Sequence, residues 1–180
     1  MPETFPRYFN PEDLGKSLKE VAVDLVKTSR RDVVSRWFHS SKDADLFIWS
    51  DLKKNIIKQQ LSFYGQVVEW NVVEGVKTGH IVIEEGRDRA GGSEFLSFDF
   101  RPQTTAIEQA VKLLGFISAL QDEERKTLTQ NFRNLAGSQN MPAEELIARF
   151  GEFLGRPNIP AQGSSIWKRL VERLSSWFKT

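Results

Sequence analysis

The sequence predicts an α+β protein: one N-terminal helix, a curled and mainly antiparallel sheet of five or six strands, then three or four C-terminal helices. Residues 31–100, where we expect the sheet, are rich in β-branched and aromatic residues that alternate with polar ones. The segments between these strands are short, which favours antiparallel pairing. From residue 101 onward the apolar spacing becomes helical. This segregation along the chain indicates α+β, not alternating βαβ units.

Composition excludes several classes of function. The chain has 180 residues, 39% hydrophobic and 27% charged, which is ordinary for a globular domain with its own core. It has no cysteine, so disulfides, thiol nucleophiles, iron–sulfur clusters and zinc–thiolate sites are absent. The net charge of +1 argues against a nucleic-acid partner. With no signal-peptide pattern and no apolar run long enough to span a bilayer, we expect a cytoplasmic protein, with peripheral membrane attachment left open.

The first helix is predicted to begin at Asn10-Pro11. Asn10 suits the N-cap position, and proline is favoured in the first helical turn. An apolar stripe at helical spacing follows, made by Leu14, Leu18, Val21 and Leu25. We expect this helix to run to about Thr28.

Residues 31–40 fit both a strand and a helix. Val33, Val34, Trp37 and Phe38 suit a strand but also stand at helical spacing. We favour a strand, because residues 42–44 have the character of a turn into a clear strand at 45–50.

The stretch from Asn55 to Gly75 changes the phase of its alternation at Gly65. Apolar residues occupy odd positions before this glycine and even positions after it. A strand can change phase only where a residue is left unpaired or the chain turns. We therefore predict a bulge or a sharp bend within two residues of Gly65, with Phe63 and Trp70 both buried.

Two further strands are expected at 76–85 and 94–100, separated by a loop at 86–92. Several of the strands carry large apolar or aromatic residues at both odd and even positions, as in the run Leu46, Phe47, Ile48, Trp49. A sheet with one solvated face would alternate more cleanly. We therefore expect either cover on both faces or a curled half-barrel.

Three helices are predicted after the sheet. A capping box at Thr105 and Glu108 opens the first, through about Leu120, and Asp122 caps the second. The third begins at 140–142 and ends near 155. The domain is then expected to span 1–155, followed by a Pro/Gly-rich linker at 156–164 and a C-terminal helix at 165–180.

The C-terminal helix is the strongest docking candidate in the sequence. It has a wide apolar face, and four basic residues against a single acid, Glu172, on the rest of its surface. Such a helix either binds an anionic membrane surface or a partner's groove, or packs back onto its own domain. The predicted docking residues are Trp167, Lys168, Arg169, Leu170, Arg173, Leu174, Trp177 and Phe178.

Two other places could hold chemistry. Arg87 and Arg89 lie among glycines in the 86–92 loop, where guanidinium groups and backbone amides could bind a phosphate or a small ligand. The cluster from His39 to Asp45 holds imidazole, hydroxyl and carboxylate groups, but no partners fixed for a hydrolytic triad are visible. We predict no catalytic residue, no cofactor and no metal site.

The sequence therefore favours a non-catalytic intracellular binding or adaptor module. It would dock to a protein partner or a membrane surface through the C-terminal helix or an aromatic surface of the sheet. The alternative is a small-ligand or phosphate-binding domain that uses Arg87 and Arg89, and a hydrolase comes third. Homo-oligomerisation is compatible with all three.

Overall fold

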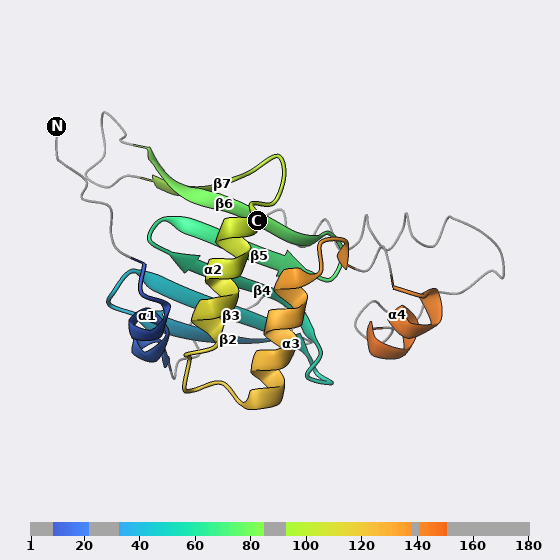
Figure 1. The fold of residues 1–180 in the computed structure, drawn as a ribbon. Helices are drawn as coiled ribbons and strands as arrows, with labels where there is room; N and C mark the ends of the chain where they lie inside the picture. The colour runs from blue at the N-terminus through green and yellow to red at the C-terminus, as the bar shows by residue number, and fades with distance from the viewer. Residues whose placement is uncertain (1–8, 22–32, 85–92, 138–140, 151–180) are drawn as a thin grey trace, which may run out of the picture.

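A computed structural model describes residues 9–21, 33–84, 93–137 and 141–150 (Figure 1). They form a seven-stranded antiparallel sheet whose strands follow one another in sequence order, with helices packed on one face. The α+β class and the antiparallel sheet are confirmed. The elements are α1 (Pro11–Ser17), β1 (Lys19–Glu20), β2 (Val33–Ser40), β3 (Ala44–Asp51), β4 (Ile56–Phe63), β5 (Gln66–Asn71), β6 (Gly75–Glu84), β7 (Ser93–Phe98), α2 (Thr104–Leu114), α3 (Asp122–Arg133) and α4 (Ala143–Phe150).

The first helix begins as predicted but is much shorter. The Asn10 side chain accepts a hydrogen bond from the Asp13 backbone amide at 3.1 Å, which is the expected N-cap. The helix ends at Ser17, not near Thr28, and Leu18 is already extended.

The seventh strand comes from this early end. β1 pairs with β2 over two residues, and the Val21 amide continues the contact by donating to the Trp37 carbonyl at 2.8 Å. The chain thus forms hydrogen bonds to the edge of β2, which would otherwise be unpaired, and does not continue the helix that the apolar spacing predicts. Leu14 and Leu18 still reach the core from their separate elements, since both are fully buried.

The phase change at Gly65 is a two-residue hairpin turn. Tyr64 and Gly65 have φ values of 49° and 77°, the positive values that a type I′ turn requires. The turn places Phe63 opposite Gln66, so odd residues of β4 share a face with even residues of β5. Phe63 is 1% exposed and Trp70 is 4% exposed, and the prediction is confirmed.

Residues 33–40 form a strand, as favoured over a helix; residues 31 and 32 lie outside the described ranges. All eight residues of β2 pair with β3 in unbroken antiparallel register. Six strands of the predicted order are therefore present, and β1 is the addition.

The sheet is not curled, which corrects the expectation of a half-barrel. That expectation rested on aromatic residues on both faces. One face is covered by helices, whereas on the other face Trp37, Phe47 and Trp49 stack against each other. Mutual stacking removes much of their surface from water, so the sheet does not need to close around them.

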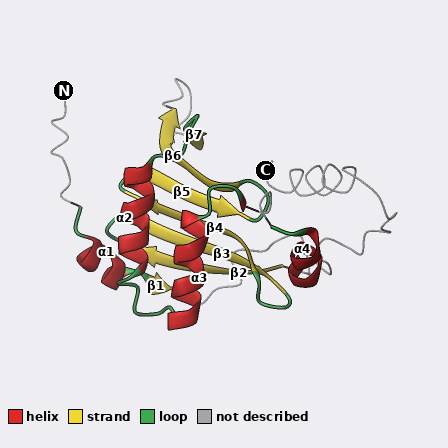
Figure 2. Ribbon diagram, turned by 45° about the vertical axis from the view of Figure 1, so that its right-hand side comes forward, coloured by secondary structure: helices red, strands yellow, loops and turns green. Residues whose placement is uncertain are grey.

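The core lies between the sheet and the layer formed by α1, α2 and α3, as Figures 1 and 2 show. The fully buried residues of this layer include Phe38, Leu46, Leu61, Val68, Leu113, Leu114, Leu128 and Phe132. The described part of the chain holds four helices, α1 before the sheet and α2, α3 and α4 after it.

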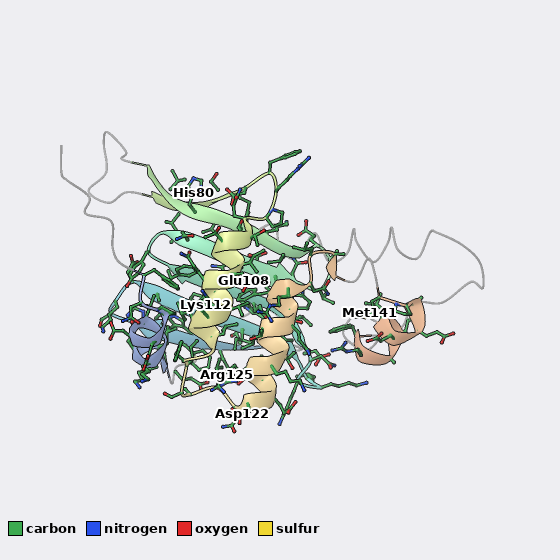
Figure 3. All side chains as sticks on the ribbon, in the orientation of Figure 1. His80, Glu108, Lys112, Asp122, Arg125 and Met141 are labelled. Carbon is green, nitrogen blue, oxygen red and sulfur yellow. The ribbon has the colours of Figure 1, made fainter. Side chains whose placement is uncertain are left out.

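The predicted capping box does not form. The N-cap of α2 is Gln103, two residues before the predicted N-cap Thr105, and it makes no side-chain cap bond. The connection between the end of α2 and the start of α3 is a separate feature. It is held by Arg125, whose guanidinium donates to the carbonyls of Ile117 and Leu120 at 3.1 and 3.0 Å. Figure 3 labels Arg125 near the start of α3. Residues 151–180, which include the predicted linker and last helix, lie outside the described ranges.

Candidate docking surface

The face of the sheet opposite α1, α2 and α3 carries a row of aromatic side chains. Trp37 on β2 pairs across the ladder with Phe47 on β3, and Trp49 lies two residues further along the same strand. Because strand side chains alternate between faces, all three point away from the core that Phe38, Leu46 and Ile48 enter. We call Trp37, Phe47 and Trp49, with their polar neighbours His39, Asp45 and Lys58, the aromatic face.

The three rings form a continuous stack. The Trp37 and Phe47 ring centroids are 5.8 Å apart with planes inclined by 2°, and those of Phe47 and Trp49 are 5.8 Å apart with planes inclined by 21°. All three side chains are half-buried. The stack thus presents a flat apolar surface on a rigid strand pair.

Asp45 fixes the end of the stack. Trp37 Nε1–H donates to Asp45 Oδ1 at 2.8 Å, and His39 Nδ1 lies 2.8 Å from the same oxygen. His39 and Asp45 are directly opposite in the β2–β3 register, so the ladder itself sets this contact. The single carboxylate holds both rings in one orientation.

Lys58 on β4 borders the other side of the stack. Its ammonium lies 5.2 Å from the centre of the Trp49 ring and 3.0 Å from the Glu69 carboxylate on β5. Glu69 is only 5% exposed, and the pairing with Lys58 offsets the cost of burying its charge. The aromatic face therefore has apolar rings at its centre and paired charges at its border.

The His39–Asp45 pair does not belong to a hydrolytic triad in the described part of the chain. Ser40 is buried on the opposite face of β2, where its hydroxyl lies 2.6 Å from that of Ser17. Ser62 lies opposite Asp45 but on the side away from His39. Of these two described hydroxyls, neither is placed for His39 to deprotonate.

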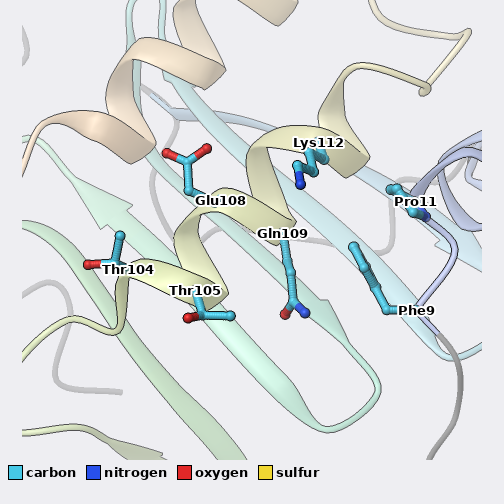
Figure 4. Close-up of a pocket in the computed structure, with 7 residues that line it drawn as sticks. All are labelled: Phe9, Pro11, Thr104, Thr105, Glu108, Gln109 and Lys112. Atoms are coloured by element: carbon cyan, nitrogen blue, oxygen red, sulfur yellow. The ribbon is translucent and has the colours of Figure 1, made fainter.

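A groove of about 480 Å³ runs beside α2 (Figure 4). Phe9 and Pro11 form one side, and the other is lined by Thr104, Thr105, Glu108, Gln109 and Lys112. Figure 3 labels Glu108 and Lys112 along α2, where both side chains are exposed. The side-chain carbonyl oxygen of Gln109 is buried without a hydrogen-bond partner among the described residues. It is therefore an unused acceptor on a residue that lines the groove.

The predicted site residues lie outside the described ranges. This applies to Arg87 and Arg89 and to all eight docking residues between 167 and 178, which therefore stay predictions. Within the described ranges, no three His, Asp or Glu side chains gather where they could hold a metal ion. Over the same residues, no helix combines the length and apolarity needed to cross a bilayer.

The sequence indicates that the residues of the aromatic face share one side of the sheet, but not whether helices cover that side. Trp37, Phe47 and Trp49 alternate with core residues, so their common face could be expected. Which of the two faces the helices cover depends on the packing of α2 and α3, far along the chain.

Comparisons with protein-family models, with curated proteins and with solved structures found no match.

Proposed function

We propose that the protein is a non-catalytic binding module that docks a protein partner through the aromatic face. The observation that carries the proposal is the Trp37–Phe47–Trp49 stack on the sheet face opposite the helix layer. Tryptophan and other aromatic residues dominate the energetics of protein interfaces, where they form central apolar patches bordered by polar groups.

The aromatic face is also preorganised. The Asp45 carboxylate and the β2–β3 ladder already restrain Trp37, and stacking restrains Phe47 and Trp49. A partner therefore immobilises few additional rotamers when it binds, which lowers the entropic cost of association. Lys58, the lysine of the aromatic face, is already paired with Glu69, so this face offers little positive charge to a phosphate backbone, which favours a protein over a nucleic acid.

Site-specific photo-crosslinking can test the proposal. A photoreactive phenylalanine analogue at Trp49 should link one protein in cells, whereas the same analogue at the exposed turn residue Leu52 should not. The captured protein is then purified and titrated against the unmodified chain. Trp49→Ser should weaken binding by about tenfold or more, since interface tryptophans often contribute over 1 kcal/mol.

Leu135→Ser is the matched control, because Leu135 is 62% exposed on a different surface. It should leave the affinity unchanged. If position 49 links nothing beyond what position 52 links, or if Trp49→Ser binds as tightly as the unmodified chain, the aromatic face is not the docking surface.

A small polar ligand in the α2 groove is a second candidate, favoured by the unused Gln109 acceptor. A hydrogen-bond donor placed there would satisfy a buried carbonyl oxygen. Fragments that donate hydrogen bonds should shift the Gln109 side-chain amide signals in NMR spectra. The Gln109→Leu variant should lose this binding, and binding that persists in the variant would place the fragments elsewhere.

A further inference from the structure

The two edges of the sheet are very different. β1 has only two residues, Lys19 and Glu20, and both are exposed and charged. Short, charged edge strands are a common protection against pairing with another chain. β7, at the opposite edge in Figure 1, has six residues and carries exposed Leu96 and Phe98, 39% and 40% exposed.

Part of the β7 backbone points away from β6, toward the outer edge of the sheet. The Asp99 amide donates to the Thr78 carbonyl on β6 at 2.8 Å. Hydrogen-bonded and non-bonded residues alternate along an antiparallel ladder, so Leu96 and Phe98 direct their N–H and C=O groups away from β6. No described strand pairs with this outer edge.

The exposed side chains of β7 point to one side of the sheet. Leu96 and Phe98 lie on the side of the sheet that carries the aromatic face, and Gly79 on β6 is the residue opposite Phe98. A Cβ at Gly79 would lie 2.3 Å from the Ser97 carbonyl oxygen, so β6 and β7 approach closely there. Beyond the strand, Phe100 is 97% exposed.

We propose that β7 pairs with β7 of a second copy of this chain, antiparallel and about a two-fold axis at Ser97. This register places Leu96 opposite Phe98 of the partner and Phe98 opposite Leu96 of the partner, so each exposed apolar side chain meets another. It also joins the outward-facing backbone groups of these residues in hydrogen-bonded pairs. One surface serves both copies, as a two-fold interface requires.

The register avoids electrostatic conflict. Asp99, which directly follows β7, would stand opposite position 95 of the partner, and Glu94 would stand opposite position 100, so neither acid faces another acid. Like charges directly opposite each other would be destabilising. A single strand pair buries a small area compared with a standard interface, so the dimer should be weak and concentration-dependent.

The absence of cysteine allows a direct test. Ser97→Cys would place two thiols directly opposite in a non-hydrogen-bonded pair, where Cα atoms are about 4.5 Å apart, within the disulfide range of about 4.4–6.8 Å. Mild oxidation should yield a covalent dimer rapidly. Ser118→Cys, in the exposed α2–α3 connection, is the matched control and should remain monomeric.

Sedimentation equilibrium provides the second readout. The unmodified chain should approach twice its mass of 20.6 kDa as its concentration rises. Leu96→Lys should raise the dissociation constant by roughly tenfold or more, since it replaces a buried apolar contact by a charge. Leu52→Lys, which changes a 68% exposed residue in the β3–β4 turn, should not. A chain that stays monomeric up to its solubility limit, or a dimer unaffected by Leu96→Lys and not linked by Ser97→Cys, would overturn the proposal.

Discussion

At Gly65, backbone conformation disfavours a side chain, whereas the surrounding space would accommodate one. Its φ is 77°, a value that residues with a Cβ seldom adopt, yet a Cβ built there meets no atom within 4 Å. The neighbouring Tyr64 adopts a positive φ despite its side chain. The hairpin turn therefore depends on glycine at one of its two positions for conformational reasons alone.

Gly65→Val should lower the free energy of unfolding by about 1–3 kcal/mol, because valine is strained at positive φ. Gly65→Asn should cost much less, since asparagine tolerates this conformation. Urea unfolding of the three proteins measures both differences. Equal losses for valine and asparagine would show that strain at this residue does not control stability.

The Glu20–Arg36 pair ties β1 to β2 and should make stability depend on pH. Arg36 Nε donates to Glu20 Oε1 at 2.6 Å, and Arg36 also contacts Glu124 on α3. The hydrogen bond from Arg36 lowers the pKa of Glu20 below its ordinary 4.5, outweighing the opposing effect of burial. Since the folded pKa is the lower one, the stabilisation is present above about 4.5 and is lost as pH falls through the folded value.

Glu20→Gln should therefore reduce stability at about pH 7 and make no difference in strong acid. The effect should be small, because the Glu20 side chain is 41% exposed and water screens the pair. Urea unfolding across this pH range measures it. A difference between the two proteins that persists unchanged in acid would show that ionisation of Glu20 is not its cause.

At the scale of elements, the sequence predicted what depends on local pattern. The strands, the turn at Gly65 and the start of α1 all follow from alternation, positive φ or capping chemistry. The predicted end of α1 was wrong, because the chain leaves the helix to form β1, and β1 exists only through its hydrogen bonds to β2. The face that the helices cover was also beyond prediction, since it depends on contacts between distant segments.

Gln59 shows such a contact. It is at a position of β4 that faces the core and is fully buried, although its side chain is polar. Its amide donates to the Leu128 carbonyl at 2.8 Å and its carbonyl accepts from Asn131 at 2.9 Å. Both partners lie on α3, about 70 residues later, so nothing local indicates them. These bonds set the position of α3 on the sheet.

Gln59→Leu should destabilise the protein by about 1–3 kcal/mol, because it leaves the partly buried side-chain amide of Asn131 without its acceptor. Asn131→Leu in the same background should restore part of the loss, since both polar groups are then gone. A double-mutant cycle by urea unfolding measures the coupling. Strictly additive losses would show that the two side chains do not stabilise the fold as a pair.

At the scale of the whole molecule, helices cover one face of the sheet and aromatic rings line the other. α1, α2 and α3 already cover the core face. If residues 165–180 form the predicted helix, its apolar stripe must be covered either by an external surface or elsewhere on its own domain. The aromatic face is the candidate surface on its own domain.

A chain ending at Gly163 tests these two roles of the C-terminal segment. If residues 165–180 dock externally, truncation should shift the melting midpoint by less than about 2 °C, since 1 kcal/mol corresponds to about 2–4 °C at this size. The full chain should bind anionic vesicles in a salt-sensitive way, because four basic residues lie in this segment, and the truncated chain should not.

The same truncation reports on the aromatic face. The sequence has five tryptophans, and removal of Trp167 and Trp177 leaves those of the sheet, Trp37, Trp49 and Trp70. Trp70 is buried in the core, so increased quenching by acrylamide would come from the two on the aromatic face. External docking predicts no increase on truncation beyond the loss of the two removed residues. A marked fall in the melting midpoint, together with greater quenching of Trp37 and Trp49, would show that the segment packs on the aromatic face of its own domain.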